Sequence, residues 1–296
     1  MEKIKRTLGF IFAHPLAKRH PLKSFSRFLA WQMQSYFFPH KLFVKSFVGQ
    51  VKFYARKKLT GITGNIYVGL HEFQDMAFLL HFLREGEGFL DIGSNVGSYS
   101  LLSAGVCRAR TIAFEPISTT FDILTSNIVL NKLDNLVTPV NAAVGASKGT
   151  LVFTSDADTT NHVLEDASVA GNTVKVPVVT IDESLENLSP SLIKIDVEGY
   201  ETEALKGMTK TLDIPTLKAI IIELNGSGAR YGYDEDAIHQ LLLSKGFKPY
   251  AYDPFNRKLE TMEQWGDMNT IYCRDTDFIS ERLTAAPKIK IMGEAI

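Results

Sequence analysis

From residue 88 onward, short apolar runs alternate with helix-length amphipathic segments, and this alternation restricts the fold more than any other feature of the sequence. The first unit is the run GFLDIG, followed by a turn and the helical segment GSYSLLSAGVC. Strands that alternate with helices indicate a doubly wound α/β fold, with a mostly parallel sheet and right-handed crossovers. The runs expected as strands are 88–93, 109–116, 136–145, 191–199, 217–226, 247–252 and 269–274.

A polar interval interrupts this pattern between residues 149 and 182, where Ser, Thr, Asp and Asn are frequent and no helical period is present. Two β-branched runs within it, TLVFT at 150–154 and VKVPVVTI at 174–181, predict a strand pair joined by a polar loop. Long polar loops in compact α/β domains more often carry function than packing.

Two helices are expected before residue 88. The segment SFSRFLAWQMQSYFF at 24–38 has helical spacing, with Ser24 as its cap and Pro39 as its stop, and its apolar face either packs on the rest of the chain or meets an interface. A turn at GITGN, 61–65, then leads to a helix over 71–83. The apolar positions are Phe25, Phe28, Leu29, Met33, Tyr36 and Phe37 in the first helix, and Phe73, Met76, Ala77 and Leu80 in the second.

The formal net charge of −1 conceals a strong asymmetry. Residues 1–60 carry 13 Lys or Arg, one acid (Glu2) and 12 of the 31 aromatic residues, whereas the remainder carries 19 basic and 32 acidic residues. A basic, aromatic segment is typical of a surface that meets anionic lipid or nucleic acid, or it wraps around the acidic remainder of the same chain. We therefore divide the chain into a helical N-terminal segment at 1–65, a main domain at 66–275 and a C-terminal tail at 276–296.

No window approaches the ~18 uninterrupted apolar residues of a membrane span. The apolar stretch LGFIFAHPLA is too short, and no convincing cleavage site follows it. The two cysteines, Cys107 and Cys273, have no C-x-x-C spacing and are expected to be free thiols in a reducing compartment. We predict a cytoplasmic protein, with peripheral contact to an anionic membrane through residues 1–60 left open.

The turn DIGSNVG at 91–97 indicates which ligand the sheet binds. Gly93 and Gly97 let the backbone pass close to a ligand, but their G-x-x-x-G spacing differs from the G-x-G-x-x-G turn that holds a pyrophosphate. Asp91 would repel phosphates and can accept from an ammonium group, and Glu115, at the end of the second strand, suits ribose hydroxyls. Because ligands of open α/β sheets bind at the carboxyl ends of the strands, S-adenosylmethionine fits this combination.

Several segments, in this order from about residue 66 to 250, resemble the FkbM family of S-adenosylmethionine-dependent methyltransferases. The resemblance implies a class I methyltransferase (Rossmann-like) fold, with a seven-stranded, mostly parallel sheet whose last strand is reversed. It also implies methylation of hydroxyl oxygens on sugars, glycans or natural products. The segments are FLDIGSNVGSYS, AFEP, VNAAVG, VPVVTIDE, LIKIDVEGYETEALKG (the most specific) and IIIELN.

The same resemblance implies the cofactor-binding residues. The turn from Asp91 to Gly97 matches the family's cofactor turn, Glu115 the ribose acid, and Glu72 an acid near the methionine ammonium group. The third strand end, at residues 141 and 142, matches the position beside the adenine. Residues 1–60 lie outside the family's core and inherit no role. The implied set is Glu72, Asp91, Gly93, Asn95, Gly97, Glu115, Asn141 and Ala142.

The motif LIKIDVEGYE places Lys194, Asp196 and Glu198 on one side of a strand, and these are the predicted catalytic residues. A lysine in an apolar strand is costly to bury unless it is paired, so Lys194 either neutralises a neighbouring acid or belongs to the site. A hydroxyl acceptor benefits from a general base. Asp196 is the first candidate for that base or for orienting the acceptor, Glu198 the second and His162 the third.

Glu223 and Asn225, at the end of the run IIIELN, are candidates for binding acceptor hydroxyls. Asp196, Glu198 and Glu223 are hard oxygen ligands of the kind Mg²⁺ prefers, but their spacing does not demand a metal, and no Cys or His cluster indicates zinc. We therefore predict no metal.

Two alternatives to an O-methyltransferase with a small-molecule or glycan acceptor stay open. An NAD-linked oxidoreductase is disfavoured by the spacing of the glycine turn. A non-catalytic membrane- or glycan-binding protein on the same fold would have lost the cofactor-site residues, which are present here. No nucleic-acid partner is expected, because no Pro-Pro-Tyr or Pro-Cys element follows a strand.

Overall fold

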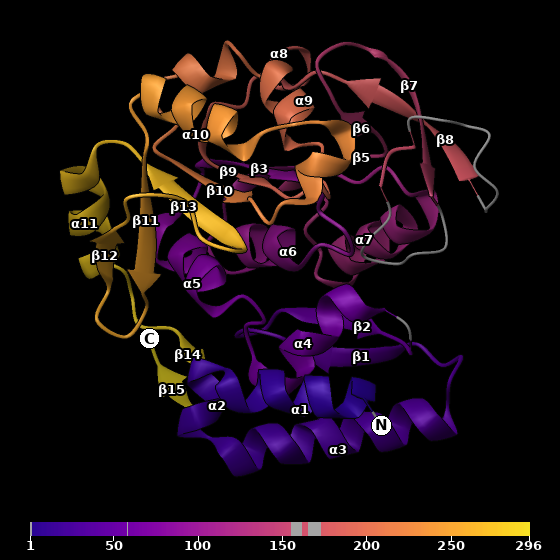
Figure 1. Cartoon of the computed structure of the whole chain (residues 1–296). Helices are drawn as coiled ribbons and strands as arrows, with labels where there is room; N and C mark the ends of the chain where they lie inside the picture. Colours follow the sequence, from indigo (N-terminus) through magenta and orange to yellow (C-terminus); the bar gives the residue numbers. More distant parts are fainter. Residues whose placement is uncertain (1, 58, 155–161, 165–172) are drawn as a thin grey trace.

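The computed structural model describes residues 2–57, 59–154, 162–164 and 173–296. A central sheet is covered by helices on both faces, and the N-terminal helices lie beneath this body (Figure 1). The sheet has the strand order β12-β11-β13-β10-β9-β3-β4-β5. Its strands are β3 (Gly88–Ile92), β4 (Arg110–Phe114), β5 (Val137–Val140), β9 (Pro190–Ile195), β10 (Ala219–Glu223), β11 (Lys248–Asp253), β12 (Lys258–Thr261) and β13 (Asn269–Cys273).

Every strand expected for the main sheet is present. Strands β10, β9, β3, β4 and β5 pair in parallel, and β13 is antiparallel to both of its neighbours, which confirms the mostly parallel sheet with a reversed last strand. The count of seven strands is wrong, because β12 pairs with β11 and adds an eighth at the edge. The sequence of β12 has one large apolar residue, Leu259, and so carries no strand pattern of its own.

Alternating residues of the strands feed two separate cores. Leu90 and Ile92 pack with the helices above the sheet in Figure 1, and Phe89 packs with those below it. Both faces are therefore buried, as expected for parallel strands between two helical layers. The helices above are α8 (Ile181–Ser184), α9 (Glu201–Lys206) and α10 (Glu235–Ser244). The helices on the opposite face are α5 (Phe73–Phe82), α6 (Ser98–Gly105), α7 (Ser118–Leu130) and α11 (Thr276–Thr284), which packs with α5 and is seen at the left in Figure 1.

A second, three-stranded sheet has the order β6-β8-β7. Its strands β7 (Gly149–Thr154) and β8 (Thr173–Val179) are antiparallel, which confirms the predicted strand pair. The run expected as one strand over 136–145 is divided, since β5 ends at Val140 and β6 (Ala143–Val144) joins the second sheet. Most of the predicted polar loop, 155–161 and 165–172, lies outside the described residues.

The N-terminal segment corrects two predictions. Helix α3 begins at Pro21 and not at Ser24, which is buried inside the helix; Pro suits the first helical position because it lacks an N–H group. The turn expected at GITGN is part of helix α4, where burial of Ile62 and Ile66 outweighs the poor helix propensity of glycine. The elements here are α1 (Glu2–Ala13), α2 (Pro15–Arg19), α3 (Pro21–Phe37), β1 (Phe43–Ser46), β2 (Lys52–Ala55) and α4 (Thr60–Val68).

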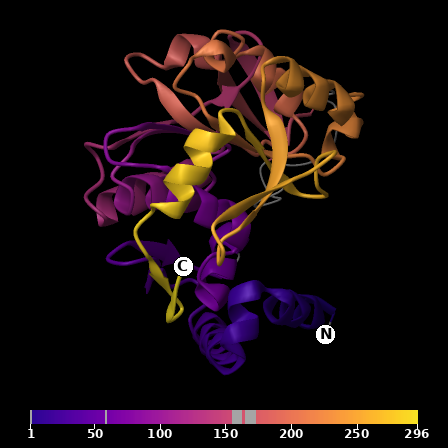
Figure 2. The same ribbon diagram turned by 90° about the vertical axis from the view of Figure 1, so that its left-hand side faces the viewer.

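The C-terminal segment returns to these helices. After α11 it forms the small hairpin of β14 (Lys290–Ile291) and β15 (Glu294–Ala295), which lies beside the N-terminal helices (Figure 2). Glu294 pairs there with Arg19 and His20. The thiols of Cys107 and Cys273 are free, and burial raises the pKa of Cys107 to about 12. Among the described residues, no helix combines the length and apolar character needed to cross a bilayer.

We predict that Gly93→Ala destabilises the fold far more than Gly86→Ala. Both glycines have left-handed φ angles, +79° and +80°, but a Cβ at Gly93 would lie 1.8 Å from the backbone oxygen of Asp196, whereas one at Gly86 meets nothing within 4 Å. Gly86→Ala should therefore cost only the conformational strain, about 1–2 kcal/mol. Gly93→Ala should cost at least about 2 kcal/mol more in urea unfolding. Equal losses would contradict the close approach of β3 to β9.

Candidate active site

The carboxyl ends of β3, β4, β9 and β10 surround a cavity of about 370 Å³, to which α4, α5 and α6 also contribute. Gly97, Asn141, His162 and Asn225 do not line it, although sequence analysis made them candidates. The predicted site residues that do line it are Glu72, Asp91, Gly93, Asn95, Glu115, Ala142, Lys194, Asp196, Glu198 and Glu223.

Asp91 forms part of the floor of the cavity. The hydroxyl of Ser100 donates to its Oδ2 over 2.6 Å, while Oδ1 is buried with no hydrogen-bond partner. Burial raises the pKa of Asp91 to about 6, although the nearby Lys194 opposes the shift. An unpartnered carboxylate oxygen beside a cavity is a ready acceptor for a cationic or hydroxyl-bearing ligand.

Glu115 is held by the backbone. Its Oε2 accepts from the N–H of Asn95 over 3.0 Å, and its Oε1 accepts from the N–H of Ile117 over 2.9 Å. Burial raises the pKa of Glu115 to about 7. Each carboxylate oxygen has a second lone pair, so the fixed side chain can still accept from ligand hydroxyls.

Gly97 and Asn141 position the site from outside the cavity. Gly97 has a φ of +94° before α6, and a Cβ there would lie 2.6 Å from Leu124. The side-chain amide of Asn141 donates to the backbone oxygens of Glu115 (2.8 Å) and Pro116 (3.1 Å). Asn141 therefore holds the loop after β4 while its neighbour Ala142 lines the cavity.

A buried cation lies among the acids. The ammonium group of Lys194 is 2.7 Å from Asp196 Oδ2 and 4.8 Å from the centre of the Tyr99 ring. Burial acts to lower the pKa of Lys194, but the carboxylates of Asp196, Glu72 and Asp91 outweigh it and raise that pKa above its usual range. Lys194 is therefore charged at neutral pH and cannot itself be a general base.

Sequence reasoning missed two members of this network, Tyr99 and Asp75. The hydroxyl of Tyr99 donates to Glu72 Oε2 over 2.5 Å, and burial raises the pKa of Tyr99 well above its usual range. Burial and Glu72 raise the pKa of Asp75 to about 7. Tyr99 lies in an apolar helical run, where the pattern predicts a core position, and Asp75 lies in the first turn of α5, where an acid is expected to interact with the helix dipole.

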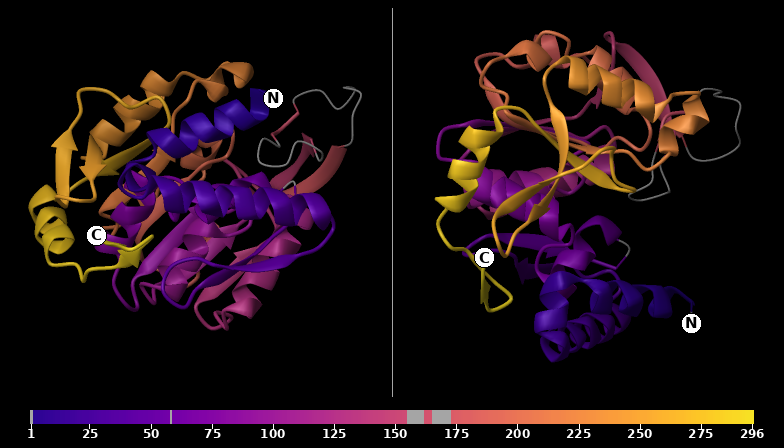
Figure 3. Two further views of the ribbon diagram at one scale, coloured as in Figure 1. Left: turned by 90° about the horizontal axis from the view of Figure 1, so that it is seen from below. Right: turned by 60° about the vertical axis from the view of Figure 1, so that its left-hand side comes forward.

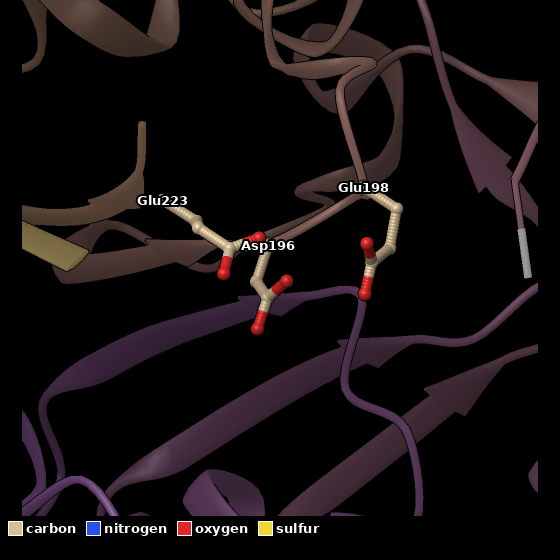
Figure 4. A group of neighbouring side chains, drawn as sticks. All are labelled: Asp196, Glu198 and Glu223. Atoms are coloured by element: carbon tan, nitrogen blue, oxygen red, sulfur yellow. The ribbon is translucent and has the colours of Figure 1, made fainter. Parts of the chain in front are cut away.

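Asp196, Glu198 and Glu223 gather their carboxyl groups at the cavity, with Asp196 between the other two (Figure 4). Carboxylate oxygens of the three lie within 4.8 Å of one another. Burial, followed by the charge of Asp196, raises the pKa of Glu198 to about 7 and that of Glu223 to about 9. The cluster therefore holds at least one proton at neutral pH, since Glu223 is protonated there.

The loop that carries Glu198 is anchored by a further acid that sequence reasoning did not single out. Glu201 is buried and accepts from the backbone N–H groups of Val197 (3.0 Å) and Gly199 (3.3 Å). Glu198 itself has a φ of +55°, and a Cβ at Gly199 would lie 2.7 Å from the Ser227 backbone oxygen. In the motif DVEGYE, the glycine therefore permits a close backbone approach and the second glutamate holds the loop.

The residues present fit S-adenosylmethionine. The orphaned oxygen of Asp91 and the carboxylate of Glu72 suit its ammonium group, Glu115 suits its ribose hydroxyls, and Ile117 and Ala142 supply an apolar wall for its adenine. The strand order, with β13 reversed between β10 and β11, is that of class I methyltransferases.

The comparison with protein families gives the same result. The model of the methyltransferase FkbM domain matches residues 91–249, more than half of the chain. The chain belongs to the FkbM methyltransferase family, its sheet has the strand order of class I methyltransferases, and S-adenosylmethionine is its cofactor. Membership in this family does not support the oxidoreductase alternative.

Two curated relatives and one solved structure are similar to the chain. Hexuronic acid methyltransferase AglP of Haloferax volcanii is 30% identical over 55% of this chain and 64% of the relative, so the chain spans less than two thirds of that protein. Methyltransferase sdnD of Sordaria araneosa is 26% identical over 59% of this chain and 79% of its own length. The crystal structure of methyltransferase FkbM from Methylobacillus flagellatus KT has a TM-score of 0.43 and 16% identity, with 74% of this chain and 55% of that chain covered.

We predict that Glu115→Gln weakens S-adenosylmethionine binding at least tenfold, about 1.4 kcal/mol, in calorimetric titration. Glutamine has one acceptor oxygen where the structure uses two, so its amide group must face a backbone N–H of Asn95 or Ile117. The exposed Glu183, paired with Lys148 outside the cavity, gives the matched control Glu183→Gln. Equal affinities for the two variants would contradict the assignment of Glu115.

We further predict a pH-dependent stability difference between Glu223→Gln and the native chain. The pKa of Glu223 is about 9 in the folded chain against 4.5 ordinarily, so the folded state holds a proton that the unfolded state releases. The native chain therefore loses stability as pH rises from about 4.5 to 9, whereas glutamine, which mimics the protonated form, does not.

The melting temperature of Glu223→Gln relative to the native chain should accordingly rise by a few degrees between pH 5 and pH 9, since about 1 kcal/mol shifts the melting temperature of a chain this large by ~2–4 °C. A difference that stays constant across this range would show that Glu223 is already ionised in the folded chain.

Proposed function

We propose that this methyltransferase methylates a hydroxyl oxygen of a sugar. The observation that carries the proposal is the cluster of Asp196, Glu198 and Glu223 beside the cofactor residues. A neutral hydroxyl is a poor nucleophile, so a methyl acceptor of this kind needs its proton removed and its oxygen aligned with the methyl group. Carboxyl groups in different protonation states supply both functions.

S-adenosylmethionine supplies an electrophilic methyl group on its sulfonium. On the protein side, Glu198 is the general base, because a pKa of about 7 suits proton removal at neutral pH. Asp196 is fixed through Oδ2 by Lys194 and orients the acceptor. The protonated carboxyl of Glu223 donates a hydrogen bond to a neighbouring acceptor oxygen. In this proposal the predicted catalytic residues Asp196 and Glu198 both act on the acceptor, and the third, Lys194, positions Asp196.

Three features support a sugar as the acceptor class. A sugar offers adjacent hydroxyls to several carboxyl groups at once, and the ring of Tyr200 lines the same cavity. The relative AglP is by name a hexuronic acid methyltransferase. Arg230, which favours the charged form of Glu198 and lies 5.9 Å from the Tyr231 ring centre, supplies a cation for the carboxylate of an acidic sugar. We therefore place uronic acids first among the sugars.

We predict that Glu198→Gln lowers kcat about 100-fold, the usual contribution of a general base, with little effect on cofactor affinity. In the native chain kcat/KM should rise with pH through about 7, as Glu198 loses its proton among Asp196, Glu201 and Arg230. That limb should be missing in Glu198→Gln and present in the control Glu183→Gln. The measurement is transfer of labelled methyl groups to glucuronic acid-containing oligosaccharides.

The assay includes neutral oligosaccharides and a hydroxylated non-carbohydrate acceptor. Methylation of the non-carbohydrate acceptor alone would overturn the sugar assignment. A pH limb retained in Glu198→Gln would overturn the role of Glu198 but leave the acceptor class intact.

A further inference from the structure

Helix α3 has two apolar faces, and only one of them is used in the fold. Its buried face consists of Ser24, Phe28, Trp31 and Ser35, with Phe28 against Tyr67 of α4. At 100° per residue, a second stripe lies about 130° away. The predicted apolar positions other than Phe28 therefore point to solvent. The side chains of the exposed stripe are Leu22 (84% exposed), Phe25 (37%), Leu29 (45%), Met33 (60%) and Tyr36 (73%).

The stripe continues onto neighbouring elements. Phe12 of α1 is 48% exposed and stacks on Phe25, with ring centres 6.5 Å apart. Phe37, the last residue of the helix, and Phe38, which follows it, are also exposed. Eleven of the fifteen large apolar side chains that are exposed in the described part of the chain fall between residues 4 and 44. A contiguous apolar surface of this kind marks an interaction site.

This surface is also basic at its edges. Lys57 and Met33 line the same small hollow, and the ammonium group of Lys41 lies 5.5 Å from the centre of the Phe38 ring. On α1, Lys5 is exposed and lies seven residues, nearly two turns, before Phe12. The first 60 residues contain Glu2 as their single acid. The surface therefore carries positive charge near the C-terminal end of α3 and on α1.

The shape of the surface is that of a shallow platform. Helix α3 is the outermost element below the catalytic body in Figure 1, and α1 and α3 lie side by side across the near face when the molecule is seen from below (Figure 3, left). With 17 residues α3 is about 25 Å long. Helices with an aromatic apolar face and lysines at its rim lie in the interfacial plane of anionic bilayers.

We infer that α1 and α3 form a docking surface for an anionic lipid bilayer. The apolar stripe enters the headgroup region, and the lysines contact lipid phosphates and carboxylates. Charge complementarity favours this partner over a second copy of the chain, because a symmetric contact would place two surfaces of the same positive sign against each other. The inference is independent of the acceptor class proposed above.

The platform is connected to the wall of the active-site cavity. Phe10 of α1 packs edge-on against His71, with ring centres 4.8 Å apart, and His71 lines the cavity. The Nε2 atom of His14 is within hydrogen-bond distance, 2.7 Å, of the backbone oxygen of Leu70. A bound bilayer would therefore hold the cavity at a fixed orientation to the membrane surface.

The test is flotation of the full-length protein with vesicles of phosphatidylcholine alone or with about 30% phosphatidylserine, the anionic lipid that polybasic surfaces prefer. We expect binding to the anionic vesicles, reduced at least tenfold by raising NaCl from about 0.1 M to 0.5 M, where screening is stronger. Leu29→Ser/Met33→Ser should lose at least tenfold in partitioning. Lys41→Gln/Lys57→Gln should lose binding to anionic vesicles.

Val129→Ser/Leu243→Ser is the matched control, because these side chains are similarly exposed (57% and 37%) but lie on α7 and α10. Cofactor affinity in each variant reports whether the fold is intact. Flotation of Leu29→Ser/Met33→Ser at the native level would overturn the inference. The inference would also be overturned if the native chain did not bind vesicles but formed a dimer, measured by light scattering. In that case Leu29→Ser/Met33→Ser would dissociate the dimer.

Discussion

The acidic residues at the carboxyl edge of the sheet depend on their interaction with the buried ammonium group of Lys194. Burying a lone cation costs several kcal/mol, and so does bringing ionised carboxylates together inside a protein. Here each cost offsets the other, since Lys194 pairs with Asp196 at 2.7 Å and is stabilised by Glu72 and Asp91. Without this cation, the carboxylates that line the cofactor cavity would take up protons and lose the negative charge that suits a sulfonium cofactor.

Strand register converts distant sequence segments into this one cluster. Asp91 of β3 lies directly opposite Lys194 of β9, and Ile222 of β10 lies opposite Ile195. The next residue along each strand is Asp196, directly after β9, or Glu223, the last residue of β10, so these two lie at the same level of the sheet. Gly93 lets the turn after β3 pass against the backbone of Asp196. The site is therefore a property of the parallel register as much as of the side chains.

These relations explain what the sequence could predict. Strands and the cofactor turn follow from local patterns, such as GFLDIG and the acid Glu115, so the fold and the Asp, Glu and Lys residues that line the cavity were predictable. Contacts between elements were not: Tyr99 looks like a core residue until α5 places Glu72 beside it, and β12 exists because β11 is its neighbour. Likewise, Gly61 and Gly64 favour a turn, but burial of the neighbouring isoleucines makes this segment helical.

The same limit applies to α3, whose apolar spacing was predicted correctly while the choice between packing on the protein and facing an interface stayed open. Periodicity identifies which side chains share a face, but it does not state which face packs against the protein. In the structure Phe28 and Trp31 are buried, whereas Leu29 and Met33 are exposed. A helix whose second apolar face is exposed loses part of its hydrophobic stabilisation unless something covers that face. Because this face stays exposed in the folded chain and has lysines at its rim, an anionic surface outside the protein can cover it.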